Sequence, residues 1–355
     1  MWLKIIIMGL IITSNLNINR LAMAESTSFK KNIEEKVIVY NWSEYIPEKA
    51  LALFTEETGI KVEYSTYDSN EVMYLRLKIL RGRGYDVVFP STYLVSRMRD
   101  EGLIQPLNHK LLNNMMHLDS RLMNRAFDSG NRYSIPYLWG TTGLGVNRSL
   151  LKDEKINSWV DLWHTKWRNK IIMIDDMREV FHIALKVNGF STNTQNPDEI
   201  RAAYESLLSL LPNIKKFSGS PKQELESNNS PIALIFNGDL AIAKESNDAL
   251  EYIYPEEGTT TWLDSFVIPS RAQNVRNAHA FINFMLRPEI AAMTSQDMGY
   301  ATPNLVGKSL LPDEVRQNPI IFQPPEKMSQ SEYQKDIRSV NRLYQLYWNQ
   351  LKSGG

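Results

Sequence analysis

Short apolar segments alternate with longer amphipathic segments along most of the chain. The short runs are rich in Val, Ile, Tyr and Phe and predict strands, whereas the longer segments repeat apolar residues at helical spacing and predict helices. Such alternation is typical of an α/β protein with parallel sheets. The predicted strands cover residues 36–40, 60–65, 86–89, 133–137, 143–146, 170–174, 232–236 and 262–268. The predicted helices cover residues 47–58, 69–80, 94–101, 178–187, 197–211, 278–286 and 332–352.

Residues that cap helices or favour turns set several of these boundaries. Gly59 is placed to end one helix, and Ser69 is placed as the N-cap of the next. Asn237 and Gly238 predict a turn after the strand at 232–236. The chain shows no internal repeat and no low-complexity linker. We therefore expect two domains joined by strands that cross between them.

The first 24 residues have the pattern of a cleavable signal peptide. Lys4 precedes an apolar run at 5–12, and residues 22–24 (Ala-Met-Ala) form the small-x-small sequence that signal peptidase reads. We predict cleavage before Glu25. The apolar run is too short to span a bilayer, which argues against the alternative of an uncleaved anchor. No later segment stays apolar over about 18 residues, so we expect the mature protein to be soluble.

Composition narrows the function classes. A chain of 355 residues is too long for one ordinary core and suits two domains. The 40 basic residues balance the 40 acidic ones, which argues against a nucleic-acid binder because such proteins carry a basic surplus. The sequence has no cysteine, so disulfides, thiolate metal sites, a cysteine nucleophile and a lipoprotein anchor are all excluded.

Familiar enzyme motifs do not occur. The glycines at 140–145 are not in the order of a dinucleotide-binding loop, and Gly307-Lys308-Ser309 lacks the upstream glycine of a phosphate-binding loop. The five histidines have no metal-ligand spacing, and there is no Gly-x-Ser-x-Gly elbow. We therefore expect no cofactor, no bound metal and no catalytic site.

Carboxylates and aromatic side chains gather where the predicted strands end, the place where open α/β sheets bind ligands. Converging carboxylates repel one another unless a cation separates them, and aromatic faces attract ammonium groups and cover methylene stems. Such a site suits a linear amine with several charges, whereas an anion would need Arg, Lys or glycine-rich amides. The segments are Asn41-Trp42-Ser43-Glu44-Tyr45, Pro90-Ser91-Thr92-Tyr93, Asp175-Asp176-Met177-Arg178-Glu179, Asn237-Gly238-Asp239, and Trp262 with Asp264.

Each of these residues also has a purely structural interpretation. Asp176 and Glu179 are spaced as a helix capping box, and Asp239 after Asn-Gly is ordinary turn chemistry. Trp42 and Trp262 are of a residue type that usually belongs to the core. Only the shared location at strand ends favours a binding site over these interpretations.

Eight motifs are distributed over essentially the whole mature chain. They are YNWSEY at 40–45, FTEETGIKV at 54–62, YDVVFPSTY at 85–93, YSIPYLWG at 133–140, DDMREVF at 175–181, IFNG at 235–238, WLD at 262–264 and GYATPN at 299–304. Together, in this order, they resemble the spermidine/putrescine-binding proteins of polyamine ABC importers. The resemblance implies a periplasmic, non-enzymatic protein that captures a polyamine and delivers it to a membrane permease. We expect it to act as a monomer.

The resemblance also implies a fold: a two-lobed, type II periplasmic binding protein of the α/β class. Each lobe would hold a mixed sheet flanked by helices, with crossover strands near 140–142 and near Trp262 as the hinge. The N-terminal lobe would take residues 27–140 and 263–308, and the C-terminal lobe residues 141–262 and 309–355.

The family's ligand contacts carry over onto matching residues. An aromatic box and a set of carboxylates would hold the amines, and we expect Asp264 and Glu179 each to neutralise a different one. Two positions depart from the spermidine pattern: Phe236 stands where Trp is usual, and Asp239 resembles the putrescine binders. Spermidine is therefore favoured, with putrescine as the alternative. The implied site residues are Trp42, Ser43, Glu44, Tyr45, Ser91, Tyr93, Asp176, Glu179, Phe236, Asp239, Trp262, Asp264, Tyr300 and Gln334.

Two other functions stay open from the residues alone. A secreted hydrolase would use Asp176 and Glu179 as paired carboxylates. The same fold would equally carry another amine, an amino acid or a metal ion, because a binding fold does not fix its ligand.

Overall fold

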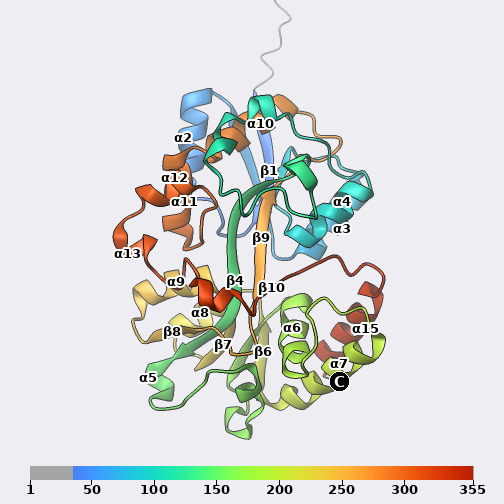
Figure 1. The fold of residues 1–355 in the computed structure, drawn as a ribbon, viewed down its shortest axis with the longest axis vertical. Coiled ribbons are helices and arrows are strands. Elements are labelled where there is room, and N and C mark those ends of the chain that lie inside the picture. Colours follow the sequence, from blue (N-terminus) through green and yellow to red (C-terminus); the bar gives the residue numbers. More distant parts are fainter. Residues whose placement is uncertain (1–34, 355) are drawn as a thin grey trace, which may run out of the picture. The chain divides into compact units, whose positions relative to one another are not determined.

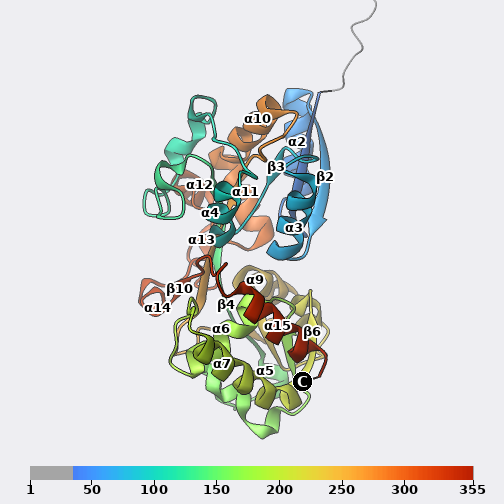
Figure 2. The same cartoon turned by 90° about the vertical axis from the view of Figure 1, so that its right-hand side faces the viewer.

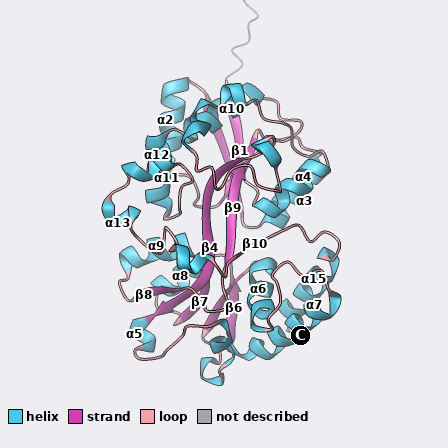
Figure 3. Ribbon diagram, in the orientation of Figure 1, coloured by secondary structure: helices cyan, strands magenta, loops and turns pink. Residues whose placement is uncertain are grey.

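The computed structural model describes residues 35–354, of which 36–354 belong to one compact unit. This unit contains two sheets with helices packed against them (Figures 1 and 3). The predicted signal peptide, residues 1–24, lies outside the described residues and stays a prediction. Among residues 35–354, no helix has the length and apolar character that a membrane crossing requires.

The first sheet is built from β1 (Lys36–Trp42), β2 (Lys61–Tyr67) and β3 (Val87–Val88), and its helices are α2 (Glu48–Thr58), α3 (Asn70–Leu80) and α4 (Thr92–Asp100). Its three strands are parallel, in the order β2-β1-β3. Both predicted caps are confirmed. Gly59 ends α2 with a left-handed φ of 70°, and the Ser69 hydroxyl accepts a hydrogen bond from the Val72 N–H at 3.2 Å.

The second sheet is built from β4 (Ile135–Asn147), β5 (Ile171–Ile174), β6 (Ile214–Ser218), β7 (Ile232–Phe236), β8 (Leu250–Ile253), β9 (Thr260–Phe266) and β10 (Glu332–Tyr333). Its order is β10-β9-β4-β7-β5-β6, and β8 also pairs with β4. β4 is antiparallel to β7, β8 and β9, whereas β5 is parallel to β6 and β7. The alternation of strands and helices favoured parallel sheets, whereas this sheet is mixed, as the family resemblance implied, because β4 runs antiparallel to β7, β8 and β9.

The remaining helices flank the two sheets or connect their strands. The α-helices are α5 (Arg148–Leu151), α6 (Met177–Val187), α7 (Pro197–Leu210), α8 (Pro221–Glu226), α9 (Asn237–Ser246), α10 (Val275–Met285), α11 (Pro288–Met298), α12 (Leu305–Leu310), α13 (Asp313–Arg316), α14 (Pro325–Met328) and α15 (Asn341–Lys352). The 3₁₀ helices are η1 (His109–Leu111), η2 (Asn113–His117), η3 (Ser129–Asn131), η4 (Trp159–Trp163), η5 (Thr165–Trp167) and η6 (Leu211–Asn213). α15 packs against α7, where the Tyr204 and Tyr347 rings stack at 4.5 Å (Figure 2).

Two long strands connect the sheets. β4 was expected as separate strands at 133–137 and 143–146, but it is continuous over 13 residues. Its start packs in one hydrophobic core and its end in the other, through Ile135 and Leu144 respectively. β9 continues alongside it, with Gly140 opposite Trp262, and isolated bridges join Val267 to Val88 of the first sheet. Gly140 lies inside this continuous strand. A glycine is required there, because a Cβ would meet the Trp262 ring at 2.6 Å.

Three other expectations differ from the structure. Asn237 and Gly238 do not form a turn, because they begin α9. The C-terminal helix starts at Asn341 rather than at residue 332, since Glu332 and Tyr333 pair with β9 instead. The sequence patterns also predicted no strand at β6, β8 or β10. They predicted no helix at α5, α8, α9, α11, α12, α13 or α14.

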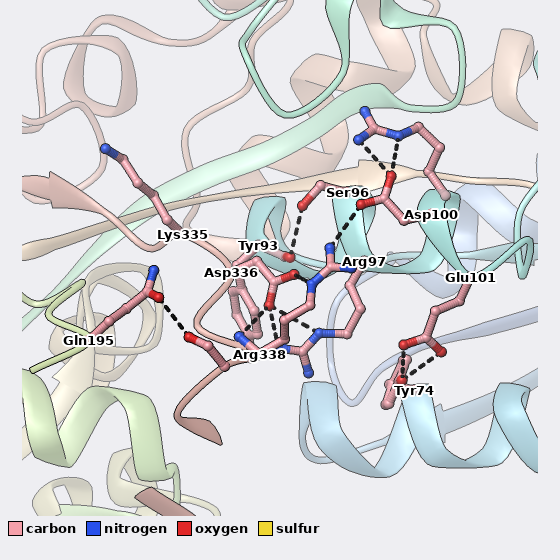
Figure 4. Close-up of polar contacts among 12 residues, drawn as sticks. Tyr74, Tyr93, Ser96, Arg97, Asp100, Glu101, Gln195, Lys335, Asp336 and Arg338 are labelled. Carbon is pink, nitrogen blue, oxygen red and sulfur yellow. Dashed lines mark hydrogen bonds and ion pairs between the residues drawn. The ribbon is translucent and has the colours of Figure 1, made fainter. Parts of the chain in front are cut away.

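The segment between β10 and α15 is bound to α4 by a polar network (Figure 4). Arg97 of α4 donates to the Asp336 carboxylate, and Arg338 donates both to Asp336 at 2.5 Å and to Asp100 at 2.9 Å. The Arg97 and Asp336 side chains are nearly buried. This network ties the C-terminal part of the chain, which otherwise packs on the second sheet, to a helix of the first sheet.

Candidate ligand-binding site

A cavity that is partly open to solvent lies where strands of both sheets end. Thirteen of the fourteen predicted site residues line it, with Tyr93 as the exception. The lining residues are Trp42, Ser43, Glu44, Tyr45, Tyr67, Asp68, Asn70, Ser91, Ile174, Asp175, Asp176, Glu179, Gly219, Phe236, Asp239, Trp262, Asp264, Tyr300 and Gln334. Strand-end loops therefore place these side chains together, as expected for an open α/β sheet.

Trp42 is the last residue of β1, and contacts with Phe89 and Tyr67 hold its side chain in place. Its indole N–H donates to the Phe89 carbonyl at 3.0 Å, and its ring leans on Tyr67 at 4.8 Å. The Tyr67 hydroxyl donates to the same carbonyl at 2.7 Å. Both rings are therefore fixed before any ligand arrives, which lowers the entropy cost of binding.

Asp264 projects from β9 into the cavity and is almost fully buried. The Ser91 hydroxyl donates to its Oδ1 at 2.6 Å, and the Asn70 amide in turn donates to the Ser91 hydroxyl at 2.9 Å. Burial raises the pKa of Asp264 to about 7, even though the hydrogen bond from Ser91 lowers it. No salt bridge to Asp264 occurs among the described residues, so its charge is left for a ligand.

Asp176 and Glu179 stand at the start of α6, and both structural and binding interpretations apply to them. Asp176 caps the helix by accepting from the backbone N–H groups of Arg178 and Glu179, and it also lines the cavity. Glu179 does not complete a capping box. Its Oε1 accepts from the Gln334 amide at 2.7 Å, and its buried Oε2 makes no well-aligned hydrogen bond among the described residues, although the Thr142 and Thr260 hydroxyls lie near enough to lower the pKa of the carboxyl. Burial, helped by the charge of Asp176, raises the pKa of Glu179 to about 8.

Four aromatic rings form a continuous row along one wall. Tyr45 meets Tyr300 edge to face at 5.3 Å, Tyr300 meets Trp262 at 5.3 Å, and Trp262 meets Phe236 at 5.7 Å. Trp262 belongs to a hydrophobic core and to the cavity wall at once, so both interpretations of it hold. Its indole N–H has no hydrogen-bond partner among the described residues and lies where a ligand group can meet it.

Asp239 lies in the first turn of α9, not in the turn that the sequence predicted. The Tyr300 hydroxyl donates to its Oδ1 at 2.7 Å. Burial raises the pKa of Asp239, although the hydrogen bond from Tyr300 and the nearby Lys222 ammonium both lower it. Asp239 thus places a carboxylate beside the aromatic row, at Tyr300.

The charged residues that line the cavity are all acidic. Seven lining residues are Asp or Glu, and no lining residue is Lys, Arg or His. Carboxylates that share a site disfavour one another's ionisation unless a positive charge lies between them. The cavity is therefore suited to an elongated cation whose apolar stem lies against the row of rings.

Comparison with known proteins agrees with this geometry. A family model of bacterial extracellular solute-binding proteins matches residues 49–323. The chain belongs to this family. The spermidine/putrescine-binding periplasmic protein of Salmonella typhimurium is 42% identical over 316 residues, which cover 89% of this chain and 91% of the relative. The putrescine-binding periplasmic protein PotF of Escherichia coli is 32% identical over 345 residues, covering 90% and 92%.

Solved structures give the same picture for this solute-binding protein. The substrate-binding protein PotD of a Streptococcus pneumoniae spermidine/putrescine ABC transporter, in complex with calcium and HEPES, is 37% identical with a TM-score of 0.76, covering 90% of this chain and 99% of that one. A protein of Listeria monocytogenes is 36% identical with a TM-score of 0.87, also covering 90% and 99%. The predicted family resemblance and the two-lobed type II fold are thereby confirmed.

Tyr93 does not contribute to the lining of this solute-binding protein's cavity. Its hydroxyl donates to Glu71 at 3.2 Å, and the Arg178 guanidinium lies over its ring, 5.2 Å from the centroid. Arg178 comes from the start of α6, so this contact joins α4 to α6. The place of Tyr93 in the aromatic box stays a prediction.

Six lining residues were not predicted. Tyr67 ends β2, and Asp68 and Asn70 follow it, so the rule that ligands bind beyond strand ends applies to these residues too. Asp175 precedes Asp176 and is paired with Lys352 at 2.7 Å. The other two are Ile174 and Gly219. Within residues 35–354, no group of three or more Asp, Glu or His side chains is arranged to hold a metal ion.

Proposed function

We propose that this solute-binding protein captures a polyamine in the periplasm and delivers it to the permease of an ABC importer. One observation carries the proposal: seven carboxylates and no basic side chain line a cavity that also has a row of four aromatic rings. The names of the relatives support it, because both sequence relatives described above are polyamine-binding proteins by name.

In the proposed complex, the ligand lies along the aromatic row. One ammonium group would pair with Asp264 and another with Glu179, whose free Oε2 needs a donor. The Trp262 ring would cover the methylene stem between them. Tyr45, Tyr300 and Trp42 would close the box, and smaller polar contacts would come from the remaining residues. The proposed contacts are Trp42, Ser43, Glu44, Tyr45, Ser91, Asp176, Glu179, Phe236, Asp239, Trp262, Asp264, Tyr300 and Gln334.

The proposal includes a lobe motion. Residues 27–140 with 263–308 would form one lobe, and residues 141–262 with 309–355 the other. β4 and β9, which run from one core to the other, would act as the hinge. A monomer leaves both lobes free to close, and the segment 1–24 would direct export and be removed.

We favour spermidine over putrescine as the ligand. Asp176, Glu179, Trp262 and Gln334 follow the spermidine pattern of the family, and all four line the cavity. Asp239 and Phe236 are the observations that favour putrescine as the second candidate. An amino acid or an amine with fewer charges would leave more of the seven carboxylates without a cation. A metal ion would make no use of the row of aromatic rings.

A catalytic role is not part of the proposal. The hydrolase alternative used Asp176 and Glu179 as an acid/base pair, but Asp176 caps α6 and Glu179 accepts from Gln334. Neither carboxylate has an assigned water or nucleophile, and roles rather than single acids define a catalytic site. Hydrolysis of a glycoside by the purified protein would contradict this.

Isothermal titration calorimetry with spermidine and putrescine tests the function. We expect tight binding of spermidine and a loss of about 2–5 kcal/mol in Asp264→Asn or Glu179→Gln, because each variant removes a buried charge partner of the ligand. Asp198→Asn is the matched control, since Asp198 is an exposed acid on α7 that pairs only loosely with Arg201 at 3.5 Å. Absence of polyamine binding by the unmodified protein, or full affinity in both site variants, would overturn the proposal.

A further inference from the structure

Three side chains from distant parts of the sequence form a series of hydrogen bonds in the cavity wall. Asn70 begins α3, Ser91 precedes α4, and Asp264 belongs to β9. The Asn70 amide donates to the Ser91 hydroxyl at 2.9 Å, and this hydroxyl donates to Asp264 Oδ1 at 2.6 Å. All three residues line the cavity, and none is more than 7% exposed. The series is therefore built into the site and largely protected from water.

A second contact fixes the orientation of the Asn70 amide. The Ser91 backbone N–H donates to Asn70 Oδ1 at 3.2 Å. A backbone N–H can only donate, so the atom that faces it must be the amide oxygen. The group that faces the Ser91 hydroxyl is then the NH₂ group, which also can only donate. The two contacts with Ser91 thus leave one orientation for the Asn70 side chain.

This orientation gives the series a direction. Because the Ser91 oxygen receives a hydrogen from Asn70, its own proton is left for Asp264. Hydrogen bonds in series polarise one another, so the first bond strengthens the second. An ionised carboxylate accepts the Ser91 proton, whereas a protonated carboxyl would compete to donate to the same hydroxyl. The direction of the series therefore favours the ionised form of Asp264.

Ser91 does not fill the structural role that is usual for its position. It is the N-cap residue of α4, where a serine side chain ordinarily accepts from a backbone N–H of the first turn, but it makes no such hydrogen bond. The backbone instead holds Ser91 beside β9. An antiparallel bridge joins Ser91 to Asp264, and the Ser265 N–H donates to the Pro90 carbonyl at 3.1 Å. The hydroxyl is thus used for Asp264 and not for the helix.

The titratable groups that face Asp264 from the surrounding elements are tyrosines. Burial raises the pKa of each hydroxyl well above its ordinary value, so all of them stay neutral where Asp264 titrates. Within residues 35–354, Ser91 makes the one well-aligned hydrogen bond to the Asp264 side chain, and the Tyr45 hydroxyl makes none. The four residues are Tyr45 after β1, Tyr67 in β2, Tyr137 in β4 and Tyr300 after α11.

We propose that Asn70 is a positioning residue that fixes the Ser91 hydroxyl as a donor to Asp264 Oδ1 and so holds the Asp264 carboxylate ready for a ligand ammonium group. This inference rests on the proposed polyamine function and deepens it. Asn70 uses both its carbonyl oxygen and its NH₂ group on Ser91, so its effect on the ligand is indirect. The site thereby gains a residue that acts through another one.

Carboxyl ¹³C NMR of the ligand-free protein with labelled aspartate tests the inference. The Asp264 signal is assigned by its absence in Asp264→Asn. In Asn70→Leu, which removes the donor to Ser91 at similar side-chain size, the titration midpoint of this signal should rise by about 0.5–1 pH unit, because the ionised form loses support. Asn213→Leu is the matched control and should leave the midpoint unchanged. Asn213 is buried in η6, away from the cavity lining, and its amide donates to the Leu162 carbonyl at 2.8 Å.

A double-mutant cycle with spermidine separates positioning from direct contact. Asn70→Leu should weaken binding at pH 7 by about threefold to tenfold. It should cause little further loss in the Ser91→Ala background, because Asn70 acts through the Ser91 hydroxyl. An equal loss in both backgrounds would show that Asn70 contacts the ligand itself and would overturn the inference, as would an unchanged Asp264 midpoint. Asn70→Ala, with the same expected directions, is the second variant if a melting curve shows that Asn70→Leu is not folded.

Failure of this inference is distinguishable from failure of the proposed function, because the NMR titration needs no ligand. If the unmodified protein binds neither spermidine nor putrescine, the proposed function is wrong and the inference, which rests on it, falls with it. If the unmodified protein binds spermidine but Asn70→Leu changes neither the Asp264 midpoint nor the affinity, only the inference is wrong.

Discussion

The Gln334 side-chain amide donates to Glu179 Oε1 at 2.7 Å across 155 positions of the sequence. Gln334 directly follows β10, and its own backbone carbonyl accepts from the Thr92 hydroxyl at 3.4 Å. A single residue thus connects the start of α4 with the carboxylate at the start of α6. It orients the Glu179 carboxylate, whose Oε2 would face the proposed ligand.

Replacement of Gln334 by Leu should weaken spermidine binding. The variant removes the neutral donor that orients Glu179, and the lost hydrogen bond corresponds to about 1.5 kcal/mol, or about tenfold in Kd. Calorimetry measures the change. Gln345→Leu is the control, because Gln345 is a partly exposed residue of α15 whose amide donates to Asn349 at 3.0 Å, away from the cavity lining. Equal affinity of Gln334→Leu and the unmodified protein would show that Glu179 needs no positioning.

Spermidine affinity should fall as the pH is lowered below 8. Burial raises the pKa of Glu179 to about 8 and that of Asp264 to about 7, so in the free protein both carboxyls take up protons between pH 8 and 6. A cation binds the ionised forms, hence each protonated group weakens binding by up to about tenfold per pH unit below its pKa.

Two measurements check this pH dependence. Kd values at pH 8 and pH 6 should differ by about two orders of magnitude or more, and Glu179→Gln should reduce the difference. Calorimetry at pH 7 in buffers of different ionisation enthalpy should show protons released on binding. A pH-independent Kd with no proton release would contradict the assignment of these groups to the ligand.

His182 should make the fold sensitive to acid. It is buried in α6, faces the Gly258 carbonyl at 3.3 Å, and burial lowers its pKa to about 3. Because the unfolded state takes up a proton near pH 6.5 and the folded state does not, stability is lost as the pH falls below 6.5. Between pH 6.5 and 5 this loss amounts to about 2 kcal/mol.

Urea unfolding of His182→Gln at the two pH values tests the effect. Glutamine keeps a donor for the Gly258 carbonyl and does not titrate, so the variant should lose less stability on acidification than the unmodified protein. His164→Gln is the control, because His164 lies in an exposed loop before η5. Parallel pH profiles for the unmodified protein and His182→Gln would rule out this role.

Asp336→Asn should destabilise the protein by about 2 kcal/mol, because Asp336 receives charged hydrogen bonds from Arg97 and Arg338 in a nearly buried position. Thermal unfolding measures the loss. Glu63→Gln, which breaks the exposed pair with Lys36, should leave the melting temperature unchanged. If both variants melt at the temperature of the unmodified protein, the network of Figure 4 does not hold the C-terminal segment in place.

Local patterns were sufficient for most of the fold. The strand at 232–236 and the Ser69 cap were predicted as they occur, because apolar runs and capping residues act within a few positions. The C-terminal helix was predicted too long, since nothing in the segment around Glu332 reveals that β9 is available to pair with it. The direction of β4 was likewise missed, because strand orientation depends on partners far along the chain.

The cavity residues divide in the same way. Trp42 was found because an aromatic residue at the end of a strand can be read directly from the sequence. Asp264 lies inside β9 and was found because it alternates with Trp262 on one face of a predicted strand. Gln334 lies far from the other site residues along the chain, and only the family resemblance brought it in. The contact of Arg178 with the Tyr93 ring could not be predicted, because it is a tertiary contact that neither the pattern nor the resemblance contains.

The Trp262 ring rests on Gly140 of the neighbouring strand, so close that the Asn237 amide and the indole occupy the space of a side chain. A cavity wall and the strand that joins the two cores are therefore in direct mechanical contact. If the two cores move relative to one another as proposed, bending between β4 and β9 would shift the indole, and a ligand that displaced the indole would strain the strands. Substitutions at this wall that alter the preferred ligand should then also alter the proposed motion.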